Sequence, residues 1–182
     1  AKQLLDEAGW AEGGDGIREK DGKKLKLRYV TFGDDQMVKS SVTAMQKMLK
    51  DIGVDMQVEE RPNSDFSRVL AEKDFDLIMS CFSSTDPFGV LYFKQDYASN
   101  SELNKSGTGT PEFDEKINEL YQISDKTEQI AKANELEKEA LAQYGIMTYA
   151  NGPQLTGVKK GLANFGAYAF AVVPKENIGW AK

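Results

Sequence analysis

Polar side chains gather in one short stretch, Ser80-Cys81-Phe82-Ser83-Ser84-Thr85-Asp86, which directly follows an apolar run at residues 75–79. Hydroxyl groups, a carboxylate and free loop amides can hydrogen-bond a small solute. Catalysis by a serine or cysteine nucleophile usually needs a histidine that titrates near neutrality, and the chain has no histidine. We therefore predict that residues 80–86 bind a ligand and do not catalyse a reaction.

Other motifs that could hold a cofactor or a metal ion are incomplete. Gly107-Thr108-Gly109 lacks the third glycine of a dinucleotide-binding loop, and residues 152–157 have phosphate-loop spacing but place Val158 where lysine is required. A single cysteine without histidine cannot build a zinc site. Residues 12–16 are better explained as a turn than as a calcium loop, because Ala11 and Gly13 occupy the first two ligand positions and Gly22 the twelfth. We predict no cofactor, no metal site and no catalytic residue.

Two groups of side chains before and within the first long helix have a structural interpretation. Asp34 and Asp35 could act as paired carboxylates, but their position just before a helix favours capping of that helix. Met37, Met45 and Met48 recur at helical spacing, which we interpret as core packing on the buried stripe of the helix.

The composition is typical of a globular protein, with 182 residues of which 40% are hydrophobic and 29% charged. The 23 basic and 29 acidic residues give a net charge of −6 without a basic stripe, so we expect no nucleic-acid partner. No apolar run approaches the roughly 20 residues of a membrane-spanning helix. We expect a single domain over residues 1–182.

Hydrophobic periodicity divides the first half of the chain into alternating helices and strands. The predicted elements are a helix at 1–10, a strand at 25–33, a helix at 36–52, a strand at 54–58, a helix at 64–72 and a strand at 75–79. Strand, helix and strand at this spacing favour a parallel crossover. The apolar strand at 75–79 is expected to be central and buried on both faces.

The second half combines a long loop with further helices. Residues 80–110 show no sustained periodicity, and a loop of this length in a compact domain is usually functional. Its aromatic residues Tyr92, Phe93 and Tyr97 either line a cleft or anchor the loop. The remaining predicted elements are a helix opened by Pro111, a helix capped by Ser124 or Asp125, and strands at 146–149 and 155–158.

Several phrases of the sequence occur in one characteristic order. They are AKQLLDEAGW at 1–10, DGIREKDGK at 15–23 running into LKLRY at 25–29, LKDIGV at 49–54, DFDLI at 74–78, and Asp86-Pro87. In this ordered set the chain resembles the C-terminal lobe of the oligopeptide/dipeptide-type extracellular solute-binding proteins of ABC importers. The resemblance covers essentially all 182 residues.

The resemblance implies an α/β fold, a periplasmic-binding-protein-like lobe with a mixed sheet flanked by helices. Residues 1–182 would be the C-terminal solute-binding lobe of a two-lobed receptor that closes by hinge motion, with the N-terminal lobe absent from the chain. Family members are generally not enzymes. The implied partners are a peptide or similar small solute and the permease subunits of the importer. The implied location is extracellular or periplasmic, and the only membrane attachment would be an N-terminal lipid anchor outside this chain.

The binding stretch departs from the family pattern. In peptide-binding relatives it resembles Gly-Trp-x-x-Asp-x-x-Asp-Pro, in which the first Asp pairs with the ammonium group of the ligand and the backbone extends the peptide as an added strand. Here Cys81-Phe82 replaces Gly-Trp, and the ammonium position falls on Ser83 when counted back from Pro87. Either Asp86 takes this role from a shorter loop, or the solute is not a free-amine peptide.

Each residue of this stretch also has a structural interpretation. Phe82 either caps the core at a strand end or contacts the ligand. Asp86 precedes a proline and favours a turn, with ligand contact as the alternative. Cys81 is expected to be a small buried packing residue and not a nucleophile.

Two other classes of function fit parts of the sequence. The chain could be a self-contained small α/β enzyme or regulatory domain, which should have its own closed pocket, or an interaction module that docks on a membrane partner without a solute. A receptor lobe should instead expose a broad open face that contains residues 80–86.

Overall fold

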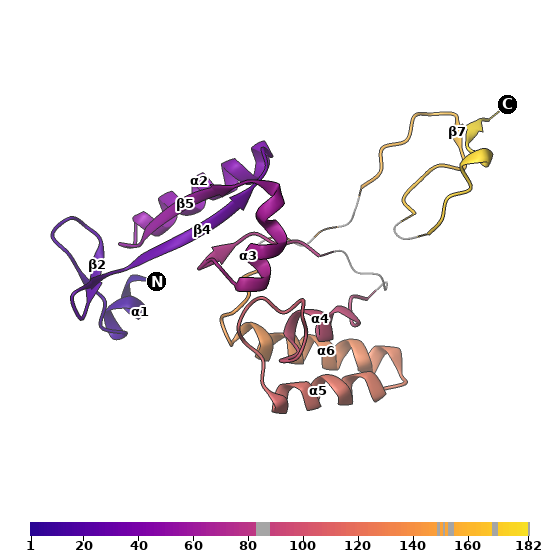
Figure 1. The fold of residues 1–182 in the computed structure, drawn as a ribbon. Coiled ribbons are helices and arrows are strands. Elements are labelled where there is room, and N and C mark those ends of the chain that lie inside the picture. The colour runs from indigo at the N-terminus through magenta and orange to yellow at the C-terminus, as the bar shows by residue number, and fades with distance from the viewer. Residues whose placement is uncertain (83–87, 149, 151, 153–154, 169–170, 182) are drawn as a thin grey trace. The chain divides into compact units, whose positions relative to one another are not determined.

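The structure is a computed structural model that describes residues 1–82, 88–148, 150, 152, 155–168 and 171–181. The chain forms two compact units, Ala1–Cys81 and Phe82–Lys182. Figure 1 shows the first unit in indigo to magenta, with strands and helices, and the helices of the second unit in pink to orange. The predicted α/β class is confirmed, because parallel strands alternate with helices in the first unit.

A three-stranded parallel sheet of order β5-β4-β6 forms the centre of the first unit. Its elements in chain order are β4 (Lys26–Phe32), α2 (Gln36–Lys50), β5 (Asp55–Arg61), the 3₁₀ turn η1 (Asn63–Asp65), α3 (Phe66–Glu72) and β6 (Leu77–Ile78). β4 and β5 pair from Lys26 opposite Asp55 to Phe32 opposite Arg61. The predicted parallel crossover from β4 through α2 to β5 is therefore confirmed.

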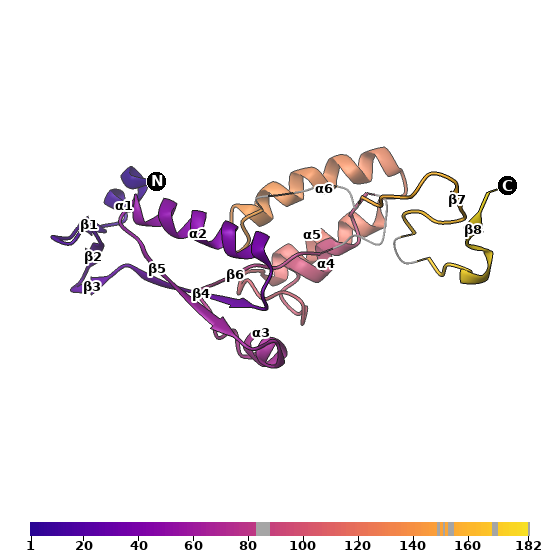
Figure 2. The same ribbon diagram turned by 90° about the horizontal axis from the view of Figure 1, so that it is seen from above.

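Helices cover both faces of the sheet, and Figure 2 shows α2 and α3 on opposite sides of β4 and β5. On one face Tyr29 and Met56 pack with Val42 of α2 in a buried cluster. On the other face Phe32 of β4 meets Phe66 of α3 edge to face, with ring centroids 5.2 Å apart. Alternate residues of a strand point to opposite faces, so β4 contributes to both layers.

α2 begins where the sequence predicts, because the side chain of Asp35 accepts hydrogen bonds from the backbone N–H groups of Met37 and Val38. The predicted buried stripe is only partly correct. Met37 and Met48 are 75% and 68% exposed, while Met45 packs against the cluster. The stripe that faces the sheet runs through Val38, Val42, Met45 and Leu49. Met37 and Met48 each lie one position before this stripe, which turns them about 100° away from it.

The prediction of a central third strand is wrong. β6 contains only Leu77 and Ile78, which are half-buried, and it pairs with β4 alone among the described residues. β4 is the central strand because it has a paired strand on each side. The backbone N–H of Arg28 donates to the carboxylate of Asp76 at 2.7 Å, and the N–H of Asp76 donates to the carbonyl of Arg28. These bonds fix where β6 begins.

A small antiparallel sheet and a helix precede the parallel sheet. They comprise α1 (Lys2–Glu7), β1 (Ala11–Glu12), β2 (Arg18–Lys20) and β3 (Lys23–Lys24). The side chain of Arg18 is 4% exposed and donates from Nε to the carbonyl of Ile52 at 2.9 Å. Its Nη1 donates to the carboxylate of Asp6 and to the carbonyl of Trp10. One buried guanidinium therefore joins α1, β2 and the turn after α2.

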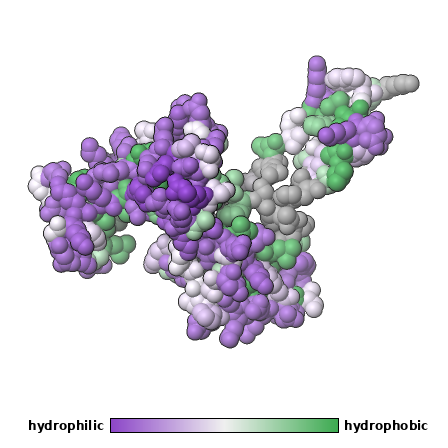
Figure 3. All heavy atoms as spheres, in the orientation of Figure 1, coloured by the Kyte–Doolittle hydropathy of each residue, from purple (hydrophilic) through white to green (hydrophobic). Residues whose placement is uncertain are grey.

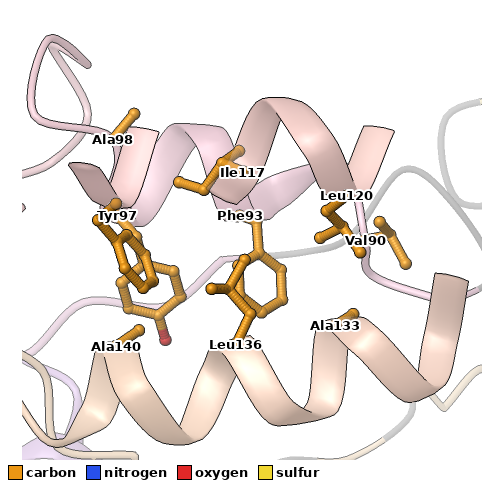
Figure 4. Close-up of a cluster of buried hydrophobic side chains, with 10 residues drawn as sticks. Val90, Phe93, Tyr97, Ala98, Ile117, Leu120, Ala133, Leu136 and Ala140 are labelled. Atoms are coloured by element: carbon orange, nitrogen blue, oxygen red, sulfur yellow. The ribbon is translucent and has the colours of Figure 1, made fainter. Parts of the chain in front are cut away.

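In the second unit, α4 (Tyr92–Tyr97), α5 (Pro111–Gln122) and α6 (Lys126–Leu141) enclose a hydrophobic cluster. Figure 4 shows Phe93 between Ile117 and Leu136. The side-chain oxygens of Thr110 and Asp125 cap α5 and α6, as Pro111 and Asp125 predicted. The expectation of a structureless loop over 80–110 is wrong because it contains α4. Phe93 and Tyr97 are 3% exposed, so they anchor this region in the core and do not line a cleft.

A single side chain organises the segment between α4 and α5. Asn104 is 7% exposed, and its Nδ2 donates to the carbonyls of Ala98 and Thr108. Its Oδ1 accepts from the N–H and the hydroxyl of Ser106. Asn104 thus bonds the backbone at Ala98, Ser106 and Thr108 and ties the two ends of the segment together.

The final described segment contains β7 (Leu162–Ala163), the 3₁₀ turn η2 (Lys175–Asn177) and β8 (Gly179–Trp180), with β7 and β8 paired antiparallel. The predicted strands at 146–149 and 155–158 are wrong for their described residues, which carry no strand. Met147 and Leu155 are 69% and 89% exposed, so neither apolar side chain is covered as it would be in a paired strand. Among the helices that the structure describes, none is long and apolar enough to cross a membrane.

Candidate functional site

In the first unit, the connections that leave the carboxyl ends of the strands run in opposite directions across the sheet. The connection from β4 leads through α2 to β5 on one side, and the connection from β5 leads through α3 to β6 on the other side. In open parallel sheets, such a reversal opens a crevice beyond the carboxyl ends of the strands, and ligands bind there. The segments at this position are residues 33–35 after β4 and residues 79–81 after β6.

The predicted binding stretch begins at this edge. Ser80 and Cys81 follow β6 after one residue, Met79, and are exposed. The expected burial of Cys81 is wrong, because β6 ends at Ile78 and leaves Cys81 beyond the paired backbone. Phe82 is 51% exposed and is the first residue of the second unit.

The other four predicted residues, Ser83, Ser84, Thr85 and Asp86, lie outside the described residues. Their contribution to binding stays a prediction, and so does the choice between Asp86 and Ser83 at the ammonium position.

The end of β4 contains a feature that the sequence argument missed. Gly33 has a φ of +72°, and a Cβ atom at this position would lie 3.5 Å from Oδ1 of Asn63. The exposed amide of Asn63, which follows β5, therefore lies directly beside the bare backbone of Gly33. The signal available in the sequence was Pro62-Asn63 immediately after a strand, which marked only a strand end.

Carboxylates at this edge are engaged in local contacts. Asp35 caps α2, and Asp34 accepts a hydrogen bond from Nζ of Lys39 at 2.6 Å. This bond, with the charge of Lys39, lowers the pKa of Asp34. The interpretation of Asp35 as a helix cap is confirmed, which leaves Asp34 and Asp35 with separate structural contacts.

Nearby charges on β4 and β5 compensate one another. Arg28 lies 2.7 Å from Asp74, and Arg61 lies 2.7 Å from Glu59 and 3.5 Å from Asp74. Figure 3 shows the most hydrophilic residues gathered over this part of the first unit. The hydrogen bond from Arg28 is the largest cause of the lowered pKa of Asp74. Two guanidinium groups and two carboxylates thus form ion pairs with one another in this part of the first unit.

A metal-binding cluster of side chains does not accompany the edge in the described part of the chain. No group of three or more His, Cys, Asp or Glu side chains is placed to hold a metal ion there. Two surface depressions of 370 and 440 Å³ lie in the second unit. Residues Leu91 and Tyr121 belong to the first, and Tyr144 and Met147 belong to the second. Neither depression is lined by Ser80, Cys81 or Phe82.

Comparison with protein families gives one match. The family described as "Bacterial extracellular solute-binding proteins, family 5 Middle" matches residues 1–104, which is more than half of the chain.

Individual relatives extend this similarity along the chain. The chain is 30% identical over 183 aligned positions to the oligopeptide-binding protein OppA of Mycobacterium tuberculosis, with 100% of this chain and 30% of OppA covered. It is 36% identical over 70 residues to the nickel-binding periplasmic protein of Escherichia coli, which covers 37% of this chain and 13% of that protein. The chain thus spans about 30% of the length of the OppA relatives.

Solved structures share the fold. The structure of the oligopeptide-binding protein AppA from Bacillus subtilis, in complex with a nonapeptide, superimposes with a TM-score of 0.65. The match has 23% sequence identity and covers 79% of this chain and 29% of AppA.

Proposed function

The chain belongs to the bacterial extracellular solute-binding proteins of family 5, and from this premise we propose that it captures peptides or similar small solutes for import by an ABC transporter. Residues 1–182 act as the C-terminal lobe of a two-lobed receptor, and the solute lies between this lobe and an N-terminal lobe. The importer partner is a pair of permease subunits.

One observation in the first unit carries the proposal. The order β5-β4-β6 reverses direction at β4, and Ser80 and Cys81 are exposed at the carboxyl end of β6 beside that reversal. Hydroxyl and backbone groups at such an edge can extend a bound peptide by main-chain hydrogen bonds. We assign residues 80–86 to solute binding on this basis.

A peptide is favoured over a nickel complex as the solute. The similarity to OppA extends over the whole chain, whereas the similarity to the nickel-binding protein covers 37% of it. The sequence contains no histidine, the commonest nitrogen ligand of metal ions in proteins.

The same family membership supports three further assignments. The receptor works outside the cytoplasm, in the periplasm or at the cell surface. It is held at the membrane by a lipid on an N-terminal cysteine that belongs to another part of the protein. Its task is binding and delivery, without a catalytic step.

Identification of a copurified solute tests this function. The full-length receptor is purified without denaturation, and bound molecules are released with acid and identified by mass spectrometry. We expect a heterogeneous set of short peptides. Recovery of a nickel complex would replace the peptide with a metal chelate as the solute, and turnover of a copurified substrate would support the enzyme alternative.

The 182-residue chain alone gives an independent test. Half of the closing contacts are absent from it, so association entropy is not compensated and peptide binding should be weak or undetectable. Isothermal titration with a peptide recovered from the full-length receptor measures this. Tight binding by the chain alone would contradict the two-lobed proposal.

A further inference from the structure

α4 is a short helix whose formation depends on its packing. It contains six residues, and no side chain caps it within the described part of the chain. Helices of this length are marginal in water unless neighbouring elements bury one of their faces. Phe93 and Tyr97 supply that burial, because each is 3% exposed in the cluster that α4 shares with α5 and α6. α4 is therefore stable only while it stays docked on these two helices.

One charged side chain is buried in the same short helix. Asp96 is 6% exposed, and its Oδ1 has no hydrogen-bond partner within the described residues. Burial alone accounts for its raised pKa of about 6, and no neighbouring cation of the described residues counters this shift. A carboxylate that is ionised, buried and unpaired is unfavourable in a folded protein.

The groups around Asp96 on α4 and α6 are phenols and an acid. Tyr92 lies one turn before Asp96, and Tyr97 directly follows it. From α6, Glu137 accepts a hydrogen bond from the hydroxyl of Tyr92 at 3.1 Å. Burial, together with the charges of Glu137 and Asp96, raises the pKa of both phenols, so these four side chains interact. An ionised Asp96 adds to the negative charge of Glu137 at this interface and does not neutralise it.

The contacts that α5 makes with α4 supply no positive charge either. Asp114 accepts hydrogen bonds from the N–H and the hydroxyl of Ser99, just after α4. The hydroxyl of Tyr121 accepts a hydrogen bond from the backbone N–H of Lys94 at 3.1 Å. Lys94 is the one basic residue of α4, and it is exposed. Ionisation of Asp96 is thus opposed from both helices on which α4 is docked.

We propose that Asp96 makes the docking of α4 sensitive to pH. With a proton on Asp96, α4 buries no charge and stays docked on α5 and α6. When the proton leaves to water, α4 opens more often and brings the carboxylate into contact with solvent. The inference concerns the fold of the second unit, and it is independent of the solute that the receptor captures.

The direction of the effect follows from proton linkage. Asp96 binds its proton more tightly when α4 is docked, because burial raises its pKa from 3.8 to about 6. The contribution of this group to docking is therefore fully present below pH 4 and is lost as the pH rises through about 6. Between pH 4 and pH 7.5 the opening equilibrium of α4 should rise about tenfold to a hundredfold.

Hydrogen exchange of α4 in the full-length receptor tests this inference. Mass spectrometry follows the amides of residues 92–97 at pH 4 and pH 7.5 in the wild type, Asp96→Asn and Glu119→Gln. Variants are compared at the same pH, so intrinsic exchange rates cancel. Asparagine keeps the shape of the carboxylate and cannot ionise. Glu119→Gln is the matched control, because Glu119 is exposed on α5 and loses the same charge.

We expect α4 to exchange about tenfold to a hundredfold more slowly in Asp96→Asn than in the wild type at pH 7.5, and no more slowly at pH 4. Glu119→Gln should match the wild type at both pH values. In the wild type at pH 7.5, α4 should also exchange faster than α5 and α6, because it opens by itself.

Limited digestion with trypsin at pH 7.5 gives a second measure of the opening. Lys94 lies within α4, so trypsin cuts after it only when the helix opens, and the cutting rate follows the open population. This rate should fall by the same factor in Asp96→Asn. Cleavage after Lys23, which is exposed in the first unit, should not change.

Three outcomes would overturn the inference. Equal exchange of α4 in the folded wild type and Asp96→Asn at pH 7.5 would mean that ionisation does not oppose docking. An equal slowing in Glu119→Gln would assign the effect to net charge. Exchange of α4 at the same rate as α5 and α6 in the wild type at pH 7.5 would mean that the unit opens as a whole.

The wild type alone decides the question if Asp96→Asn does not fold. After correction for intrinsic rates, the protection of α4 should fall about tenfold to a hundredfold from pH 4 to pH 7.5, while β4 of the first unit keeps its protection. Constant protection of α4 over this range would contradict the inference.

Discussion

Replacement of Asp96 by asparagine should stabilise the second unit at neutral pH. Asp96 lies on α4 and is 6% exposed, and its Oδ1 has no hydrogen-bond partner within the described residues. Burial raises the pKa of Asp96 from 3.8 to about 6. The charged carboxylate is therefore a cost to folding at neutral pH, which the isosteric Asp96→Asn change removes.

The sign and size follow from proton linkage. The folded state holds the proton more tightly than the unfolded state, so the contribution of Asp96 is most favourable below pH 4 and is lost as the pH rises through about 6. Each pH unit between the two pKa values is worth about 1.4 kcal/mol, which gives a loss of about 3 kcal/mol at pH 7.5. An asparagine amide without hydrogen-bond partners would itself cost about 1 kcal/mol, which reduces the stabilisation by that amount.

Hydrogen exchange by mass spectrometry can measure this effect within the whole chain. Wild type and variant are compared at the same pH, so intrinsic exchange rates cancel. At pH 7.5 we expect the protected amides of α5 and α6 to exchange about tenfold to a hundredfold more slowly in Asp96→Asn, and at pH 4 no more slowly than in the wild type. Glu135→Gln is the control, because Glu135 is 70% exposed on α6.

Equal or faster exchange of the Asp96→Asn variant at pH 7.5 would refute the reasoning. It would mean that the carboxylate is solvated or paired in the folded protein and that its burial carries no penalty. A similar slowing in Glu135→Gln would instead point to a general effect of net charge.

Three more predictions concern the stability of each unit. Arg18→Met removes three side-chain hydrogen bonds of a buried guanidinium, and urea unfolding should show a loss of about 2–4 kcal/mol. Gly145→Ala would place a methyl group 2.5 Å from Cγ2 of Thr108, so thermal unfolding should reveal a loss of about 1–3 kcal/mol, part of which Thr108→Ala restores. Asp74 has a lowered pKa, mainly because of the hydrogen bond from Arg28, so its contribution is present above pH 4 and is lost at lower pH. Acid unfolding of Asp74→Asn, followed by circular dichroism, should be less steep below pH 4 than that of the wild type.

Local signals made much of the first unit predictable. Asp35 before an amphipathic run identified the start of α2, and alternation from Leu25 and from Val54 identified β4 and β5. These features depend on neighbours in sequence, which periodicity and capping rules describe well. The parallel pairing of β4 and β5 followed because a connecting helix of this length returns the chain to the end of the sheet at which β4 began.

Features that depend on distant partners were harder to predict. An apolar strand near Leu77 looked central, but the position of a strand in a sheet is set by which strands pair with it, and β4 has both neighbours. α4 escaped notice because it has only six residues and no side-chain cap. The contact of Asn63 with Gly33 joins two strand ends that are thirty residues apart in sequence, and no local pattern indicates it.

The segment from Ala98 to Thr108 depends on Asn104 for its shape, and this has a practical consequence for labelling. Leu103, which is 49% exposed beside it, can carry a spectroscopic reporter whose signal follows the loop. The neighbouring Asn104 cannot be replaced by another residue, because no other side chain of that size both donates to two carbonyls and accepts from Ser106. A probe on Leu103 would therefore report the order of a connection in which one side chain, that of Asn104, contacts three separate positions of the backbone.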